Sequence, residues 1–222
     1  MIHDADTIRL QMLMRILYDP LSWLDVSAID PCTAFGSAPH GTPWVAWKNQ
    51  TLIDSHALTC SIDFDPLGAT LRWWIDHWWQ LRRIAYLMGC RIARASLIAS
   101  TRYARLDPVA RAFVLSPVLA PPLAPLSLSR VDEHPVARHE DSLECPSPID
   151  LTLVTQGYRC LHAHTIELPR ALGQRLDLMF SDARDVIERT GALPGIIRFQ
   201  TLIESATYHA TFSAPAPCAP PA

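Results

Sequence analysis

The stretch WWIDHWWQLRRIAYLMGCRIARASLI, from Trp73 to Ile98, decides the fold class of this chain of 222 residues. It holds four of the chain's seven tryptophans within seven residues, and a run of arginines follows them. Apolar residues recur at helical spacing, so we predict one helix from Thr70 to Met88. The buried face of this helix, at the centre of the predicted core, consists of Leu71, Trp74, Ile75, Trp78, Leu81, Ala85 and Met88.

The remaining surface of this helix divides into a polar face and an apolar margin. The polar face carries Arg72, Asp76, Gln80 and Arg83. Arg72 and Asp76 are spaced to form an i,i+4 ion pair. Trp73 and Trp79 lie away from the centre of the buried face and widen the apolar surface. A helix that is apolar over most of its circumference is normally central in a protein, and Gly89 then suits a helix end or close packing.

Helices are also predicted on both sides of this stretch. Residues 8–18 have helical periodicity and are followed by a turn, DPLSWLD, whose Trp23 is expected to pack in the core against the main helix. The segment TPWVAWKNQTLIDSHAL suits a helix that begins at Pro43. A further helix is expected over 91–103. Asp107 is the expected N-cap of the next helix, which runs to about residue 115.

The fold class that we predict is mainly α: a single compact helical domain with a long proline-rich and acidic loop. Segments LPRALGQRLDLMF and SDARDVIERTGALPG predict helices, whereas 149–161 and 196–212 suit either a helix or a minor β element in the C-terminal half. The predicted parts are an N-terminal helical part with the tryptophan-rich helix, a loop or linker, a C-terminal helical part and a disordered tail: 1–115, 116–148, 149–212 and 213–222.

Composition excludes several classes of protein. Charged residues make up 18% of the chain and the net charge is −3, so no overall charge indicates nucleic acid or anionic lipid. No apolar run reaches the roughly 18 residues expected of a membrane span. The N-terminus lacks the basic start and the cleavage site of a signal peptide. Six dispersed cysteines without a CxxC pair are expected to be free thiols in a reducing cytoplasm.

No enzyme signature is present. The sequence contains no GxSxG, P-loop, GxGxxG or HExxH motif, so we predict no catalytic residue, no cofactor and no metal site. Cys160, His162 and His164 form the most metal-like cluster, but structural zinc needs four ligands and no second pair accompanies them. The segment SIDFDP, with Asp54 nearby, favours a turn before the next helix over a pair of catalytic carboxylates.

Arginine is concentrated between Arg72 and Arg111, where eight arginines accompany two aspartates. Arginines with aromatic residues are typical of single-stranded nucleic-acid sites, but these tryptophans lie mostly on the predicted buried face. Binding of this helix to a membrane surface is also a less favoured interpretation, because the helix lies mid-chain between helices of similar character. The acidic loop after Val131 is one candidate partner for the basic surface, and the rest of that surface is open to another protein.

Three segments resemble one protein family. RILYDPLSWLDVSAI, from Arg15 to Ile29, is similar to the FDPLSYIHP segment of the OrgA/MxiK family. WWQLRRIAYLMGCRIARASL is similar to that family's tryptophan-rich helix, which runs into AYLLGC and a basic helix. A weaker similarity covers Gly157-Tyr158 and LPRALGQRLDLMF. The family's His-Pro is replaced here by Asp25-Val26, and the 116–148 loop and the tail have no counterpart in it.

The resemblance implies a non-enzymatic adaptor of the type III secretion system's cytosolic sorting platform, called SctK in the unified naming. The implied partners are the cytoplasmic domain of the inner-membrane ring protein (SctD-like) and the pod protein (SctQ-like), and indirectly the stator and the ATPase. The implied location is cytoplasmic, at the inner face of the bacterial inner membrane. The candidate protein-binding residues are Trp73, Trp79, Arg72 and Arg83, because interfaces favour Trp and Arg.

Two alternatives from other classes remain. One is a hydrolase-like enzyme on an unfamiliar helical scaffold, which a buried polar cluster in a pocket around Cys160, His162 and His164 would favour. The other is a helical nucleic-acid-binding protein, whose affinity would fall steeply with salt.

Overall fold

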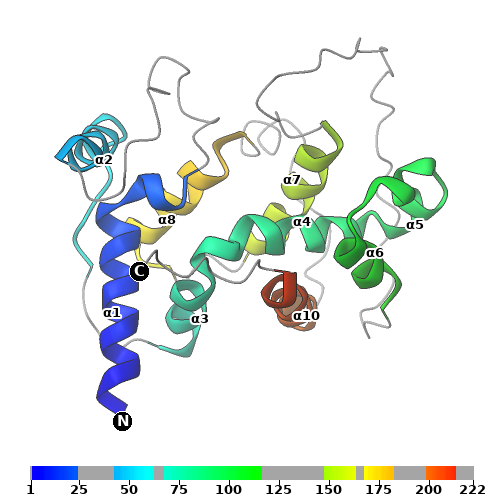
Figure 1. Cartoon of the computed structure of the whole chain (residues 1–222), viewed down its shortest axis with the longest axis horizontal. Helices are drawn as coiled ribbons and strands as arrows, with labels where there is room; N and C mark the ends of the chain where they lie inside the picture. Colours follow the sequence, from blue (N-terminus) through cyan, green and yellow to red (C-terminus); the bar gives the residue numbers. More distant parts are fainter. Residues whose placement is uncertain are drawn as a thin grey trace, which may run out of the picture. The chain divides into compact units, whose positions relative to one another are not determined.

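In the computed structural model, the described part of the chain is mostly helical. The described residues are 2–24, 43–62, 68–116, 148–163, 168–182 and 199–213 (Figure 1). No strand occurs in these stretches, which confirms the predicted mainly α fold. The minor β element is wrong for both candidate segments, because 149–161 lies in helix α7 (Pro148–His162) and 199–212 lies in helix α10 (Phe199–Ser213). In α7 the buried side chains Leu153, Val154, Tyr158 and Leu161 recur at helical spacing, not in alternation.

Some predictions lie outside the described residues. These are the structure of the proline-rich and acidic loop over 117–147, that of the tail over 214–222, and most of the helix predicted for SDARDVIERTGALPG. For the described part, the chain divides into two compact units. Unit 1 is drawn from Met1–Leu81 and Ala163–Asp185, and unit 2 from Arg82–His162 and Val186–Ala222. Each unit combines segments from both halves of the chain.

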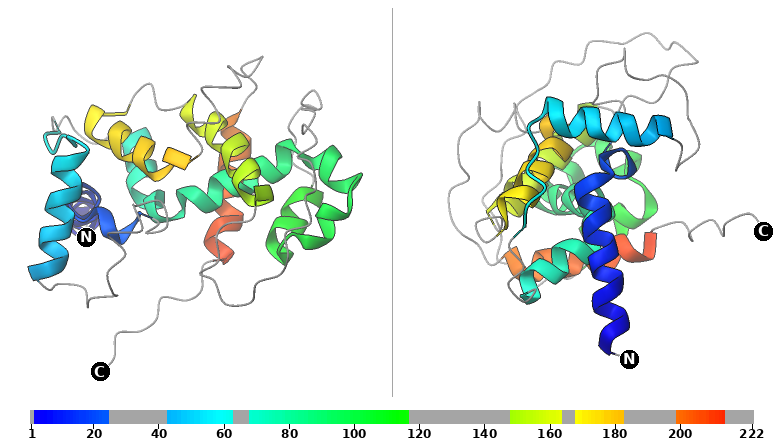
Figure 2. Two further views of the ribbon diagram at one scale, coloured as in Figure 1. Left: turned by 90° about the horizontal axis from the view of Figure 1, so that it is seen from above. Right: turned by 90° about the vertical axis from the view of Figure 1, so that its left-hand side faces the viewer.

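Unit 1 is organised around helix α1 (Ile2–Tyr18). Helix α1 contacts α2 (Pro43–Ser55), α3 (Ala69–His77) and α8 (Arg170–Met179), and Figure 2 shows α1, α2 and α8 together in both of its views. Leu13, Ile16 and Leu17 form the buried side of α1. Asp76 of α3, which was expected to pair with Arg72, instead accepts hydrogen bonds from Arg9 of α1 at 3.0–3.2 Å.

The turn after α1 is the 3-10 helix η1 (Pro20–Ser22), and it is fixed from two sides. The Trp23 indole Nε1 donates to the Ile16 carbonyl at 3.1 Å, and its ring lies edge-on to Trp78 at 5.8 Å. Asn49 of α2 is buried; its side chain accepts from the Leu21 amide at 3.0 Å and donates to Asp19 at 2.7 Å. The DPLSWL segment is therefore a structural turn that joins α1 to α2 and to the tryptophan-rich stretch.

The tryptophan-rich stretch is not one helix, as was predicted, but three elements. Helix α3 ends at His77, the 3-10 helix η4 spans Trp78–Gln80, and α4 spans Leu81–Ile92. His77 has φ of −113° and ψ of 9°, which interrupts α-helical geometry just before Trp78. Trp78 is fully buried in unit 1, so the interruption occurs where one of the largest core side chains is packed.

A buried arginine closes unit 1. Arg175 of α8 is fully buried, and its guanidinium donates to the Ile16 and Leu17 carbonyls at 3.2 and 2.6 Å and to the Thr59 carbonyl at 2.7 Å. Ile16 and Leu17 belong to the last turn of α1, where carbonyls lack helical partners and the helix dipole favours a cation. The charge is thus stabilised by carbonyl dipoles.

Unit 2 is held together by two helices that cross at glycines. A Cβ built on Gly89 of α4 would lie 1.8 Å from the Leu153 carbonyl oxygen of α7, and one on Gly157 of α7 would lie 1.7 Å from that of Ala85. The two backbones are therefore in contact, and only glycine fits at both positions. Close packing was one of the two predictions for Gly89; a helix end was the other, and it is wrong because α4 continues to Ile92.

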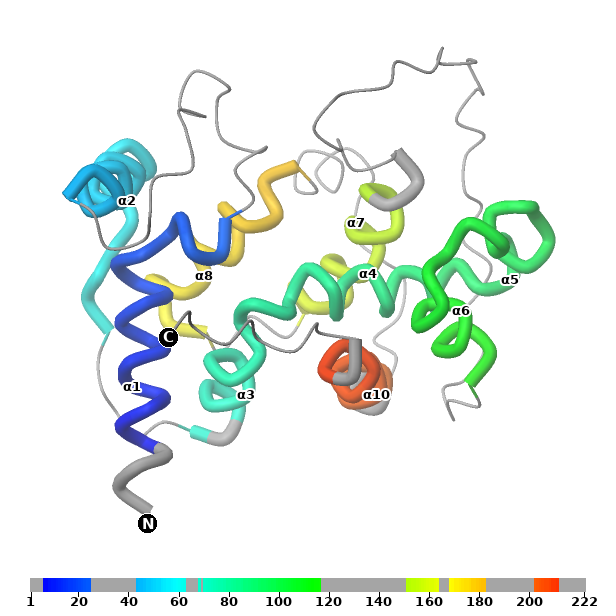
Figure 3. Tube along the Cα trace, in the orientation of Figure 1, coloured from blue at the N-terminus to red at the C-terminus, as the bar shows by residue number. Residues whose placement is uncertain are grey.

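The helix predicted over 91–103 is also divided. It consists of the end of α4, helix α5 (Arg94–Ile98) and the 3-10 helix η5 (Thr101–Arg105), and Figure 3 shows this path into α6 (Pro108–Leu115). Ser100 ends α5 because its backbone is extended, with φ of −120° and ψ of 162°, while its hydroxyl donates to the Leu97 carbonyl. Helix α6 has the predicted bounds and the predicted N-cap, since Asp107 accepts from the amides of Val109 and Ala110.

Candidate protein-docking surface

Of the four residues predicted to bind a protein, three lie in unit 1 and have different environments. Arg72 of α3 is exposed. Trp73 is half-buried, with its ring 5.1 Å from that of Trp74 and 5.3 Å from that of His77. Burial lowers the pKa of His77, against the opposing influence of Asp76. Trp73 therefore belongs to a ring cluster within unit 1, while Arg72 projects into solvent.

Trp79, in the tryptophan-rich stretch, contacts Arg15 of helix α1. It is 36% exposed, and the Arg15 guanidinium carbon lies 5.5 Å from its ring centroid. An arginine over an indole face is a cation–π contact, which holds both side chains in place without burying either. Trp79 and Arg15 thus present a positively charged, aromatic edge beside the exposed side of α1.

The fourth residue, Arg83 of α4 in unit 2, is engaged within the fold. Its guanidinium makes two hydrogen bonds to the Asp107 carboxylate, at 2.7 and 2.9 Å, and lies 5.1 Å from the Tyr86 ring centroid. Since Asp107 is also the N-cap of α6, these contacts give Arg83 a structural role in unit 2. The predicted core residues lie as follows: Trp23, Trp74, Ile75, Trp78, Leu81 and Met88 are buried, and Leu71 is half-buried.

The exposed side of α1 carries several large apolar side chains. Ile8, Leu10, Met14 and Tyr18 are between 43% and 56% exposed, and we call these four residues the α1 outer face. Leu10, Met14 and Tyr18 are four residues apart, so they form one ridge along the helix. The i,i+4,i+8 spacing of this ridge is a signal that can be read in the sequence.

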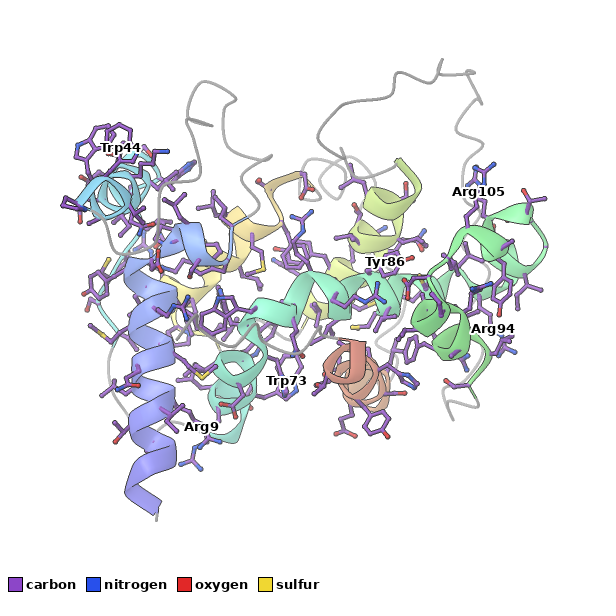
Figure 4. All side chains as sticks on the ribbon, viewed as in Figure 1. Arg9, Trp44, Trp73, Tyr86, Arg94 and Arg105 are labelled. Carbon is purple, nitrogen blue, oxygen red and sulfur yellow. The ribbon has the colours of Figure 1, made fainter. Side chains whose placement is uncertain are left out.

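Helix α2 carries a second exposed apolar feature, which we call the tryptophan pair. Trp44 and Trp47 stack with their ring centroids 4.9 Å apart and their planes 17° apart, and they are 47% and 57% exposed. Lys48 Nζ lies 5.3 Å from the Trp44 ring centroid. In Figure 4 Trp44 projects from the outer side of α2. The sequence predicted this helix but gave no reason to expect its tryptophans at the surface.

The metal-like cluster does not assemble a site in the described residues. Cys160 is buried in α7, and burial raises the pKa of its thiol to about 12 despite the charge of Arg159. His162 is exposed at the end of α7, with its ring 5.7 Å from that of Tyr158. His164 lies outside the described residues, as do Asp63 and Asp65. No group of three His, Cys, Asp or Glu side chains suited to a metal ion occurs in the part of the chain that the structure describes.

The described helices were compared with the requirements of a membrane span. Within the described helices, none combines the length and the hydropathy that crossing a bilayer requires.

Comparison with known proteins gives one match. No curated protein and no solved structure matches the chain. The family model described as bacterial type III secretion apparatus protein (OrgA_MxiK) matches residues 13–211, which include all three segments that carry the resemblance noted in the sequence. The described part of the first segment forms the end of α1 and the turn after it, and the glycines of the second and third segments meet where α4 crosses α7. The chain belongs to the OrgA_MxiK family of bacterial type III secretion apparatus proteins.

Proposed function

We propose that this protein is a non-enzymatic adaptor of the cytosolic sorting platform of a type III secretion system. It connects the cytoplasmic domain of the SctD-like ring protein to the SctQ-like pod protein, and through the pods to the stator and the ATPase. It therefore acts at the cytoplasmic face of the bacterial inner membrane. Family membership supports the place in secretion, and the exposed apolar side chains of unit 1 are the observation that supports the adaptor role.

The chemistry of these side chains suits protein partners. Tryptophan, tyrosine, methionine and arginine are enriched at the centres of protein interfaces, and the α1 outer face, the tryptophan pair and Arg15 over Trp79 supply all four types. Stacked Trp44 and Trp47 leave a large apolar area in water, which a partner would bury. Of the residues first expected to dock, we retain Trp79, which contacts Arg15 of α1, together with Arg72 and Trp73 of the same unit. Arg83 we assign to the fold.

The enzyme alternative has less support. A nucleophilic cysteine needs a lowered thiol pKa and access to solvent, whereas Cys160 is buried and its pKa is raised to about 12. His162, the nearest histidine in the described chain, is engaged with the Tyr158 ring. Neither residue provides an activated group, so we do not propose a reaction.

The test is a pull-down of the purified full chain against two proteins of the same bacterium: the pod protein and the cytoplasmic domain of the ring protein. Two double variants address the two features, Leu10→Glu with Met14→Glu and Trp44→Ala with Trp47→Ala. Ile98→Glu is the matched control, because Ile98 is an equally exposed apolar residue of α5 in unit 2. Helical circular dichroism must be unchanged in every variant.

We expect the native chain and the control to retain both partners. Each double variant should lose at least tenfold in affinity for one of them, which corresponds to about 1.4 kcal/mol. If neither partner is retained by the native chain, the adaptor proposal is wrong. If both are retained by every variant, the adaptor role stands and docking does not use the α1 outer face or the tryptophan pair.

A further inference from the structure

Unit 2 contains an unusual concentration of positive charge. Between Arg82 and Ser116 there are seven arginines, no lysine or histidine, and one carboxylate, that of Asp107. Arg83 occupies that carboxylate with two hydrogen bonds. The other arginines lie along α4, α5, η5 and α6: Arg82, Arg91, Arg94, Arg102, Arg105 and Arg111.

We call Arg94, Arg102, Arg105 and Arg111 the arginine end of unit 2. Arg94 and Arg105 are exposed and Arg102 and Arg111 are half-buried, and Figure 4 labels Arg94 and Arg105 near α5 and α6. No ion pair with a described carboxylate forms at these four side chains. The charges also affect one another: burial and then the charge of Arg94 lower the pKa of neighbouring Arg91. A dense set of like charges without counter-charges is a favourable site for an anion.

The complementary charge is present in the same chain. Residues 132–144 contain five carboxylates, Asp132, Glu133, Glu140, Asp141 and Glu144, and one arginine, Arg138, so their net charge is −4 with histidine neutral. The arginine-rich stretch from Arg82 to Ser116 has seven arginines and one aspartate, a net charge of +6. The two stretches together carry +2, and the rest of the chain brings the total to −3.

Chain connectivity favours this pairing over any free partner. Asp132 follows Ser116, the residue after α6, by 16 positions, and a chain of that length spans at most about 55 Å. A segment tethered this closely has an effective concentration in the millimolar range, which is far above that of most free partners.

From these observations we infer that the acidic segment 132–144 binds to the arginine end of unit 2 in the same molecule. The occupant is the chain's own segment, not a nucleic acid or a lipid surface, because the matching negative charge is already attached. The inference goes beyond the adaptor role and does not depend on it.

The test uses the full chain and a peptide copy of the segment. In one variant the five carboxylates are replaced by amides, as Asp132→Asn, Glu133→Gln, Glu140→Gln, Asp141→Asn and Glu144→Gln. A fluorescein-labelled peptide covering residues 130–146 is then titrated with this variant and with the native chain, and its anisotropy is measured in 50 mM and 300 mM salt.

We expect the amide variant to bind the peptide about tenfold more tightly than the native chain, whose own segment competes for the site. Binding should weaken in 300 mM salt, because exposed charges are screened. A peptide carrying the same five amides should not bind. Adding Arg94→Glu and Arg105→Glu to the amide variant should abolish binding, whereas adding Arg170→Glu, at an exposed arginine of unit 1, should not.

Three outcomes would overturn the inference. They are absence of peptide binding to the amide variant, equal binding to the amide variant and the native chain, and binding that survives the Arg94 and Arg105 reversals. Vesicles of phosphatidylglycerol and a single-stranded oligonucleotide are titrated in parallel. If either binds the native chain while the peptide fails to bind the amide variant, the arginine end has a different ligand.

Discussion

Arg83 and Asp107 form a two-pronged ion pair: Arg83 Nη2 lies 2.7 Å from Asp107 Oδ1 and Nη1 lies 2.9 Å from Oδ2. The same Oδ1 accepts the amides of Val109 and Ala110, both at 3.0 Å. One carboxylate thus begins α6 and fastens it to α4 within unit 2. Paired hydrogen bonds between guanidinium and carboxylate are among the stronger polar contacts in proteins.

Replacing Asp107 should therefore remove two functions at once. Asp107→Ala removes both the N-cap and the ion pair, and we expect it to lower the free energy of unfolding by about 2 kcal/mol. Asp107→Asn keeps an N-cap oxygen and loses the charge, so it should lower that free energy by a smaller amount. Urea denaturation followed by circular dichroism gives both values. Equal losses in the two variants would contradict a separate contribution of the ion pair.

The pH dependence of this contribution has a definite sign. Burial opposes ionisation of Asp107, but the hydrogen bonds from Arg83 and from the amides of Ala110 and Val109 hold its pKa below the ordinary 3.8. A carboxyl whose pKa is lowered by folding stabilises the fold fully above its ordinary pKa and loses that effect as pH falls through the folded pKa. Between pH 5 and pH 2 the native chain should lose more stability than Asp107→Asn. Parallel acid profiles would show that Asp107 is not a contributor.

The glycine crossing of α4 and α7 allows a sharper comparison. Alanine at Gly89 or Gly157 places a methyl group within 2 Å of a backbone oxygen, so the helices must separate. We expect each change to lower the free energy of unfolding by at least about 2 kcal/mol, in the range of overpacked cores. Gly173→Ala is the matched control, because its Cβ meets nothing within 4 Å and alanine favours a helix by about 1 kcal/mol. Thermal denaturation of the three variants measures the difference; a similar effect at all three positions would argue against the close crossing.

Much of the fold was predictable from local chemistry. Proline and aspartate mark the start of α6, and helical periodicity identifies α1, α2 and α8. Helix interruptions were not predictable, because His77 and Ser100 depart from helical geometry in a sequence whose periodicity continues. The grouping into two units also depends on which helices meet, and periodicity carries no information on that.

The sequence predicted the residue types of the candidate docking surface better than it predicted which residues are exposed there. Trp79 was expected at the margin of its helix and is partly exposed, whereas Arg83 was expected on a polar face and is engaged by Asp107, 24 residues later. The α1 outer face was not predicted, because helical periodicity alone does not show which apolar residues of a helix remain exposed. The tryptophan pair was missed because tryptophan is more often buried.

Arg175 provides the next prediction, which concerns unit 1. Its fully buried guanidinium donates hydrogen bonds to carbonyls of α1, α8 and the 58–62 segment, and burial lowers its pKa. Arg175→Lys retains the charge but has too few donors and the wrong geometry, so we expect the free energy of unfolding to fall by about 2–3 kcal/mol. Arg170→Lys, at the exposed start of the same helix, should change it by less than about 0.5 kcal/mol. Urea denaturation of both variants tests this, and an unaffected Arg175→Lys would mean that the carbonyls find other donors.

The last prediction separates a structural cysteine from a reactive one. Because burial raises the pKa of Cys160 to about 12, its thiol should stay protonated and unalkylated by iodoacetamide at pH 8 in the folded protein. Cys60 is half-buried, so its thiol is more accessible and should be alkylated at least tenfold faster than that of Cys160. Peptide mass spectrometry after timed alkylation measures each site separately, and denaturation in urea should make the two rates similar. Rapid alkylation of Cys160 in the folded chain would show an accessible thiolate in α7, and the enzyme alternative would then regain support.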